Sequence, residues 1–267
     1  MIRLIATDVD GTLVKESTPW IYPEILSAIR ECTDRGGHFC VASGRQYYSI
    51  RHMFEEVSDR IIYLAENGAH VRYQDKDILV RKMRRNHVEE LMTQLRQYDD
   101  CDVLVSSTDG SLMESRSAEF IKLIAEGYHN KYRVVDDVLA VPEDIIKVAI
   151  RHEGSIRELG ERVLIPQWKD KIKACMAGED WVDFMDASVD KGNALKVIQE
   201  YLGITAAETM AFGDNDNDIG LLAAAGESYA VANARDSVKA NAKHICPSYH
   251  EKGVYHVIKE LLEEMYA

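Results

Sequence analysis

The N-terminal sequence Arg3-Leu-Ile-Ala-Thr-Asp8-Val9-Asp10-Gly11-Thr12 carries the strongest structural signal of the chain. A short apolar run ends in two aspartates that stand two residues apart, immediately before a glycine. Because side chains at positions i and i+2 of an extended chain point to the same side, both carboxylates can face one site. The pattern therefore predicts a buried strand with a chemical site at its carboxyl end.

An Asp-x-Asp-Gly stretch also occurs in two unrelated structures. One is a simple acidic turn, since Asp and Gly are common in turns. The second is the start of an EF-hand calcium loop, but that loop needs Glu at its twelfth position. Counting from Asp8, the twelfth residue is Pro19, so the calcium-loop hypothesis fails.

The chain after this stretch alternates short apolar runs with amphipathic ones. Strands predicted at 38–42 and 61–65 alternate with helices at 25–35 and 47–56, and the same alternation of strands and helices returns after residue 190. Strands joined by crossover helices are typical of α/β proteins with a parallel sheet. We therefore predict an α/β fold with a Rossmann-like parallel-sheet core.

The middle of the chain has several short strands and fewer crossover helices. Short strands with few crossover helices favour an α+β module with an antiparallel sheet. We expect an inserted α+β domain at 83–186, and a core domain assembled from 1–82 and 187–267.

Composition limits the partners and the location. The 267 residues include 32 basic and 45 acidic ones, which gives a formal net charge of −13. This charge repels polyanions, so we predict no nucleic-acid partner and no membrane partner. The five cysteines are odd in number and form no C-x-x-C pair. We expect free thiols in a reducing compartment, and hence a cytoplasmic protein.

A second acidic motif, Gly213-Asp214-Asn215-Asp216-Asn217-Asp218, follows an apolar run and precedes a predicted helix. Alone it is equally well interpreted as a solvated turn. In an open parallel sheet, however, ligands bind beyond the carboxyl ends of the strands. Two acidic strand ends in one sheet therefore favour a shared site for a hard cation such as Mg²⁺.

Two further strand ends offer what a phosphate needs. Ser43-Gly44-Arg45 supplies a hydroxyl, a flexible amide and a helix start, all able to donate to an anion. Lys191 stands at the start of a predicted helix, where the helix dipole favours an anion. Taken separately, Ser43 is interpreted as a helix N-cap and Lys191 as a surface charge.

The order of these motifs resembles the haloacid dehalogenase-like hydrolase superfamily, and within it the Cof-like phosphatase subfamily with a type IIB cap. The resemblance covers the whole chain, and Glu66-Asn67-Gly68-Ala69 also resembles a turn of that subfamily. Two departures exist. Ser43 stands where threonine is common, although the hydroxyl is kept, and residues 230–234 lack an expected glycine, which leaves the details of that loop open.

The resemblance implies a Mg²⁺-dependent phosphomonoester hydrolase that acts through an aspartyl-phosphate. In that reaction Asp8 is the nucleophile, and Asp10 is the general acid and then the base. The implied metal ligands are Asp8, Asp214 and the backbone carbonyl of Asp10. The implied phosphate-binding residues are Ser43, Gly44, Lys191 and Asn217. Asp218, Arg45 and Gly11 are implied as supporting residues, with Arg45 contacting either the substrate or a structural salt-bridge partner.

The implied substrate is a small phosphorylated metabolite such as a sugar phosphate, and we expect a monomer or small homo-oligomer. The cap is expected to close over the site, with Arg116 and Arg133 as candidate contacts to an anionic substrate. Three alternatives stay open. The chain could be a phosphotransferase or mutase with the same intermediate, a phosphoaspartate signalling switch, or an inactive binding protein.

Overall fold

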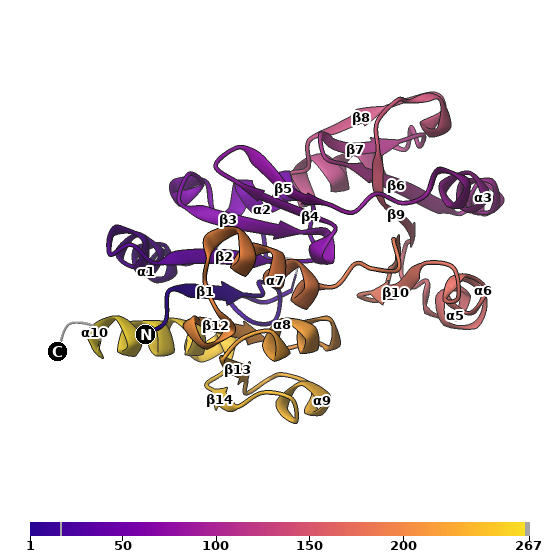
Figure 1. Ribbon diagram of the computed structural model, residues 1–267. Coiled ribbons are helices and arrows are strands. Elements are labelled where there is room, and N and C mark those ends of the chain that lie inside the picture. The colour runs from indigo at the N-terminus through magenta and orange to yellow at the C-terminus, as the bar shows by residue number, and fades with distance from the viewer. Residues whose placement is uncertain (17, 265–267) are drawn as a thin grey trace. The chain divides into compact units, whose positions relative to one another are not determined.

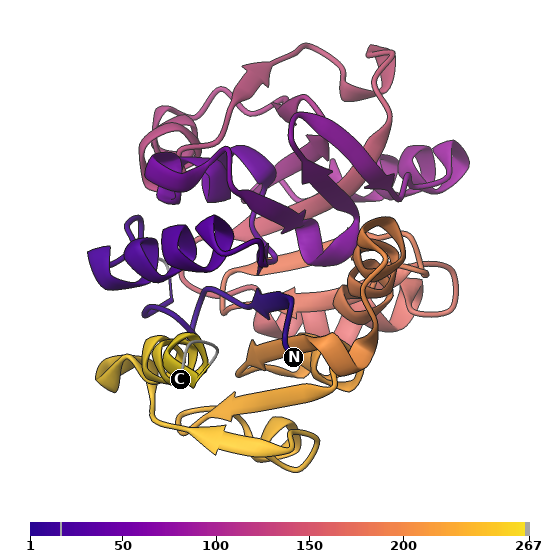
Figure 2. The same ribbon diagram turned by 60° about the vertical axis from the view of Figure 1, so that its left-hand side comes forward.

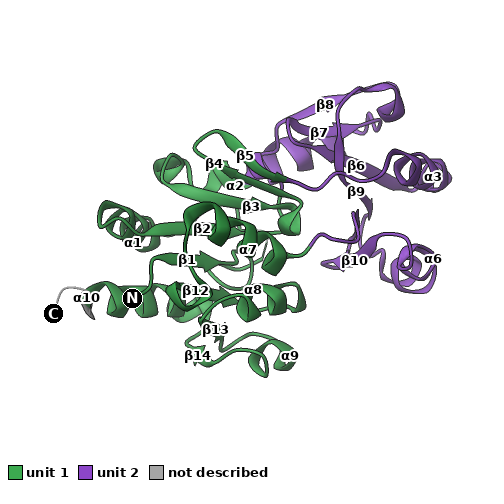
Figure 3. Cartoon of the chain, in the orientation of Figure 1, with its two compact units in different colours: residues 1–45, 50–79, 190–267 green, residues 46–49, 80–189 purple. Residues whose placement is uncertain are grey.

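The computed structural model describes residues 1–16 and 18–264, which fall into two compact units (Figures 1 and 3). Unit 1 contains residues 1–45, 50–79 and 190 onward, and unit 2 contains residues 46–49 and 80–189. Unit 2 is therefore built almost entirely from one continuous segment, which interrupts the chain of unit 1.

Unit 1 is built on an eight-stranded sheet. All pairs from β14 to β3 are parallel, whereas β4 runs antiparallel to β3. The predicted parallel α/β core is thus confirmed. In spatial order the strands are β14 (His244–Cys246), β13 (Glu227–Val231), β12 (Thr209–Gly213), β1 (Leu4–Thr7), β2 (His38–Ala42), β3 (Ile61–Ala65), β4 (His70–Tyr73) and β5 (Lys76–Val80).

Helices cover both faces of this sheet. Figure 2 shows α1 (Pro23–Asp34) and α10 (Gly253–Glu264) on one side and α7 (Lys191–Leu202) on the other. α1 begins with proline at its first position, where the missing N–H costs nothing, and buries an apolar stripe that includes Ile25 and Ile29. Unit 1 also contains α8 (Ile219–Ala223) and α9 (Asp236–Lys239), and α2 (Tyr47–Met53) belongs to it from residue 50 onward.

Strand β1 lies at the centre of the sheet, between β12 and β2. The chain moves from β1 to β2 and β3 on one side, and later builds β12 and β13 on the other. β1 is therefore at the point where the strand order reverses, which is where open α/β sheets bind their ligands. The burial of Leu4, Ile5 and Ala6 fixes β1 in the core.

Unit 2 contains a six-stranded sheet with helices. The pairs from β10 to β7 are antiparallel, as predicted, but β7 and β8 are parallel. The strands in spatial order are β10 (Lys173–Ala177), β11 (Trp181–Met185), β9 (Ile145–His152), β6 (Cys101–Ser107), β7 (Gly110–Met113) and β8 (Tyr132–Val134). The helices are α3 (Arg85–Leu95), α4 (Ala118–Lys122), α5 (Arg157–Leu159) and α6 (Ile165–Trp168).

Candidate active site

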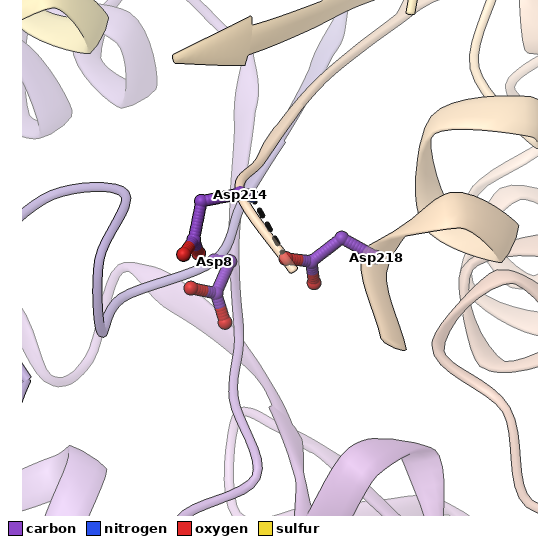
Figure 4. A group of neighbouring side chains, drawn as sticks. All are labelled: Asp8, Asp214 and Asp218. Carbon is purple, nitrogen blue, oxygen red and sulfur yellow. Dashed lines mark hydrogen bonds between the residues drawn. The ribbon is translucent and has the colours of Figure 1, made fainter. Parts of the chain in front are cut away.

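Three carboxylates meet at the carboxyl ends of β1 and β12. Asp8 follows β1, and its backbone N–H donates to the Phe212 carbonyl of β12 at 3.0 Å. Asp214 follows β12, and Asp218 closes the short helix η7 (Asp216–Asp218). One oxygen from each of the three carboxylates lies within 4.8 Å of the others (Figure 4). The parallel pairing of the two strands therefore brings together aspartates more than 200 positions apart in the sequence.

Lys191 joins this group from the first position of α7. Its Nζ lies 2.6 Å from Asp8 Oδ1 and 2.6 Å from Asp218 Oδ1, and its side chain has no exposed surface. The interpretation of Lys191 as a surface charge is therefore wrong. Burial by itself would lower the pKa of Lys191, but Asp218 and Asp8 outweigh it and hold the pKa above its ordinary value. The ammonium stays protonated.

Asp218 has both of its carboxylate oxygens engaged by the chain. Oδ1 accepts from Lys191, and Oδ2 accepts from the backbone N–H groups of Asp214 (3.1 Å) and Asn215 (3.2 Å). A Cβ on Gly213 would lie 2.4 Å from Asp218 Cβ, so only glycine permits this approach. Asp218 therefore fixes the position of the Lys191 ammonium and of the loop that begins at Asp214.

The buried carboxylates are held at an electrostatic cost. Burial, with repulsion from Asp218 and Asp214, raises the pKa of Asp8 well above its ordinary value, although Lys191 offsets part of the effect. Burial and Asp218 raise the pKa of Asp214 to about 6, against a hydrogen bond of 2.9 Å from the Thr12 hydroxyl. The site holds three carboxylates, of which the Lys191 ammonium contacts two, and their oxygens are hard donors. The donor set therefore fits a hard divalent cation held by Asp8 and Asp214.

Asp10 lies outside this group of three carboxylates. Its carboxylate receives two hydrogen bonds from Arg45, Nε to Oδ2 at 2.7 Å and an η nitrogen to Oδ1 at 2.6 Å. The chain turns after Asp10, where the Gly11 N–H donates to the Val14 carbonyl at 2.7 Å. The two aspartates of the first motif therefore have different partners, since Asp8 pairs with Lys191 and Asp10 pairs with Arg45. Of the two roles implied for Arg45, the structure shows a salt bridge.

The loop that carries Ser43 and the loop that carries Asn217 are connected by a residue that sequence reasoning missed. The Asn67 N–H donates to the Ser43 carbonyl at 3.0 Å, and the Asn217 amide Nδ2 donates to Asn67 Oδ1 at 2.8 Å. Ser43 is buried, and its hydroxyl accepts from the Arg45 N–H at 3.1 Å. Gly44 lies against the Asn67 side chain. The signal in the sequence was the Asn-Gly turn itself.

The turn at Gly11 depends on two neighbouring loops. Gly11 has φ +83°, and a Cβ there would lie 2.3 Å from Asp214 Oδ2. The Gly11 carbonyl accepts from Asn233 Nδ2 at 2.7 Å. Asn233 belongs to the loop that lacks the expected glycine, and it is a second contact that sequence reasoning did not find.

The candidate arginines of unit 2 are engaged with acidic residues. Arg116 pairs with Asp136 at 2.5 Å, with both side chains largely exposed, and Arg133 pairs with Glu143. Both arginines therefore already have an acidic partner within unit 2.

The five cysteines are free. Within the described residues, no helix is both long enough and apolar enough to cross a membrane.

The fold and the site define a Rossmann-like α/β protein with a buried group of aspartates and one lysine at the central strand ends. Residues 5–258 match the haloacid dehalogenase-like hydrolases, and the chain belongs to this family. The resemblance predicted from the motifs is thus confirmed.

Its relatives are named phosphatases. The chain is 27% identical over 262 residues to 5-amino-6-(5-phospho-D-ribitylamino)uracil phosphatase YbjI of Escherichia coli (strain K12), covering 98% of this chain and 97% of that protein. It is 24% identical to HMP-PP phosphatase of Citrobacter koseri, covering 98% and 97%.

Solved structures share the fold of this chain. A protein from Eubacterium rectale is 36% identical, with a TM-score of 0.87 over 97% of this chain and 99% of that one. A subclass IIB sugar phosphatase shares the fold with a TM-score of 0.80 at 23% identity, covering 97% and 98%.

Proposed function

We propose that this protein is a Mg²⁺-dependent phosphomonoester hydrolase that acts through an aspartyl-phosphate on Asp8. The observation that carries the proposal is the buried Lys191 ammonium, 2.6 Å from both Asp8 and Asp218. Taking these charges out of water is costly, and strongly perturbed buried charges of this kind are concentrated at functional sites. Membership of a hydrolase family with phosphatase relatives supports a phosphate ester as the substrate.

In the first step, Asp8 attacks phosphorus, and the bond from phosphorus to the ester oxygen breaks. Lys191 holds one oxygen of Asp8 and so orients the other. Asp10 gives its proton to the leaving oxygen, which departs as an alcohol. Lys191 favours the ionised form of Asp8 by its charge and its hydrogen bond, so the nucleophile needs no separate base.

In the second step, Asp10 takes a proton from water, and the water oxygen attacks phosphorus and releases Asp8. Donors hold the phosphoryl oxygens throughout: the Ser43 hydroxyl, the Gly44 N–H, the Lys191 ammonium and the Asn217 amide. When Mg²⁺ is bound by Asp8, Asp214 and the Asp10 carbonyl, it supplies positive charge that offsets repulsion between carboxylate and phosphate.

The substrate we propose is a small phosphorylated metabolite, such as a sugar phosphate or another phosphomonoester. The support is that YbjI is named for a phosphoribityl compound and a further neighbour is named a sugar phosphatase. We further propose that residues 83–186 form a cap domain inserted in a core of 1–82 and 187–267. We also propose that the protein is cytoplasmic and is a monomer or a small homo-oligomer.

The test is release of inorganic phosphate from a generic aryl phosphate, with and without Mg²⁺, by wild type and Asp8→Asn. The exposed Asp59→Asn is the matched control. We expect metal-dependent turnover by wild type and Asp59→Asn, and none by Asp8→Asn with an intact circular dichroism spectrum. Full activity in Asp8→Asn would refute the proposal, and transfer of phosphate to an added sugar instead of water would favour a phosphotransferase.

A further inference from the structure

Asn67 has a left-handed backbone conformation, which residues other than glycine seldom adopt. It lies in the short helix η2 (Glu66–Gly68) after β3, with φ 57° and ψ 21°, and the preceding Glu66 has φ 51°. Asparagine tolerates this left-handed region better than most residues, but two such residues in succession are costly. Strained backbone persists where surrounding contacts enforce it, and such places are concentrated at functional sites.

The contacts of Asn67 connect the loops that follow three different strands. Its N–H donates to Ser43 after β2 at 3.0 Å, and its Oδ1 accepts from Asn217 after β12 at 2.8 Å. Asn67 itself follows β3, and only 7% of it is exposed. The residue therefore links two others that are proposed to bind the phosphoryl group.

The glycines on either side of this link show how closely it is packed. A Cβ on Gly44 would lie 3.2 Å from Asn67 Nδ2 and 3.3 Å from its Oδ1. Gly68 has φ +99°, and a Cβ there would lie 2.7 Å from the Asp190 carbonyl, next to Lys191. The turn is thus fixed against the bare backbone of the Ser43 loop and against the start of α7.

We infer that Asn67 is a positioning residue of the phosphoryl site, which acts through Asn217. The Asn217 amide nitrogen carries two hydrogens, and Asn67 accepts one of them. That bond fixes the rotation of the amide group, so the second hydrogen has a defined direction. Without Asn67, the Asn217 side chain would have to be ordered when substrate binds, at an entropic cost. The inference rests on the proposed function, because it concerns the same site.

The test combines Asn67→Gly with Asn217→Ala in a double-mutant cycle. Glycine accepts the left-handed conformation and removes only the side chain. The readouts are kcat and KM for an aryl phosphate and the inhibition constant of inorganic phosphate. Gln74→Gly is the matched control, because Gln74 is also a non-glycine residue with positive φ (48°) but lies in an exposed turn.

We expect Asn67→Gly to weaken phosphate inhibition and to lower kcat/KM about tenfold, the size expected from one hydrogen bond. In the Asn217→Ala background, the same change should have almost no further effect. Multiplicative effects in the double variant, or an Asn67→Gly protein that behaves like Gln74→Gly, would overturn the inference. Absence of turnover in wild type would instead refute the proposed function.

If Asn67→Gly does not fold, Asn67→Asp replaces it. Aspartate tolerates the same backbone and keeps an acceptor for Asn217, but it places a negative charge beside the proposed anion site. We expect phosphate inhibition at least about tenfold weaker, with a melting temperature near that of wild type. An unchanged inhibition constant would contradict the inference, because the added charge would contact Asn217 at the proposed phosphoryl site.

Discussion

Lys191 sets the charge balance of the site at the scale of single residues. Its ammonium lies 2.6 Å from both Asp8 and Asp218. Removing one partner from a buried ionic group leaves the others uncompensated, which is far worse than removing the whole group.

We therefore expect Lys191→Met to abolish turnover and to lower the free energy of unfolding by about 3–5 kcal/mol at neutral pH. Lys196→Met, at an exposed position of the same helix, is the control. Urea unfolding measures the difference. A Lys191→Met protein as stable as Lys196→Met would show that the pair is not a buried ionic group.

The pairing of Arg45 with Asp10 leads to a prediction about leaving groups. The Arg45 guanidinium holds both oxygens of Asp10, the residue that we propose gives and takes the proton. Without the guanidinium, the Asp10 carboxylate loses its fixed orientation. An alkyl ester needs that proton more than an aryl ester does, because alkoxide is the poorer leaving group. We expect Arg45→Lys to lower kcat about tenfold or more for an alkyl phosphate and distinctly less for an aryl phosphate. Equal losses on both substrates would contradict this role.

At the scale of elements, the turn after β1 decides whether the carboxylates can meet. Gly11 combines a positive φ with a site for Cβ only 2.3 Å from Asp214. Gly203, which ends α7, has a similar φ of +61° but open space around it. The two glycines separate the cost of backbone conformation from the cost of a collision.

We expect Gly203→Ala to cost about 1 kcal/mol of stability and to leave activity unchanged. Gly11→Ala should cost more than this and reduce kcat/KM at least about a hundredfold, because Asp214 must move. Thermal melting and steady-state kinetics measure both effects. Gly11→Ala activity within about twofold of wild type would show that Asp214 need not stay where the turn places it.

The sequence predicted those elements that are buried and bounded by clear stop signals. β2 and β3 have the predicted bounds, because the apolar runs there end at Ser43 and Glu66, and α7 begins at Lys191 as predicted. Strands β8 and β14 were missed, since each has three residues and too little pattern to detect.

In the candidate site too, some residues could be predicted from the sequence and others could not. Asp8, Asp214, Asp218 and Lys191 could be predicted because each closely follows a strand or begins a helix. The Arg45–Asp10 pair depends on side-chain directions after a turn, which spacing does not encode. The link from Asn67 to Asn217 joins residues 150 positions apart, so only the packed structure shows it.

At the scale of the whole molecule, the acidic site makes stability depend on pH. Asp214 has its pKa raised from 3.8 to about 6, so folding favours its protonated form. Its contribution to stability is therefore fully present below about pH 4 and is lost as pH rises through about 6. A shift of this size, for a mostly buried group, corresponds to about 1–3 kcal/mol.

We predict that Asp214→Asn, measured without metal, is more stable than wild type by about this amount at about pH 8 and nearly equal to it at about pH 4. Thermal melting in chelator measures the difference. Adding Mg²⁺ at the higher pH should raise the melting temperature of wild type but not that of the variant. A variant less stable than wild type at the higher pH without metal would contradict the electrostatic account.

The most direct test of the central claim is to follow phosphate on Asp8 during turnover. Labelled substrate is mixed with enzyme and Mg²⁺, quenched in acid at successive times and chased with unlabelled substrate, and the labelled peptide is identified by mass spectrometry. We predict label on Asp8 that forms and disappears at least as fast as phosphate is released. Turnover with no label on Asp8 at any time, or label that persists through the chase, would contradict the proposed hydrolase.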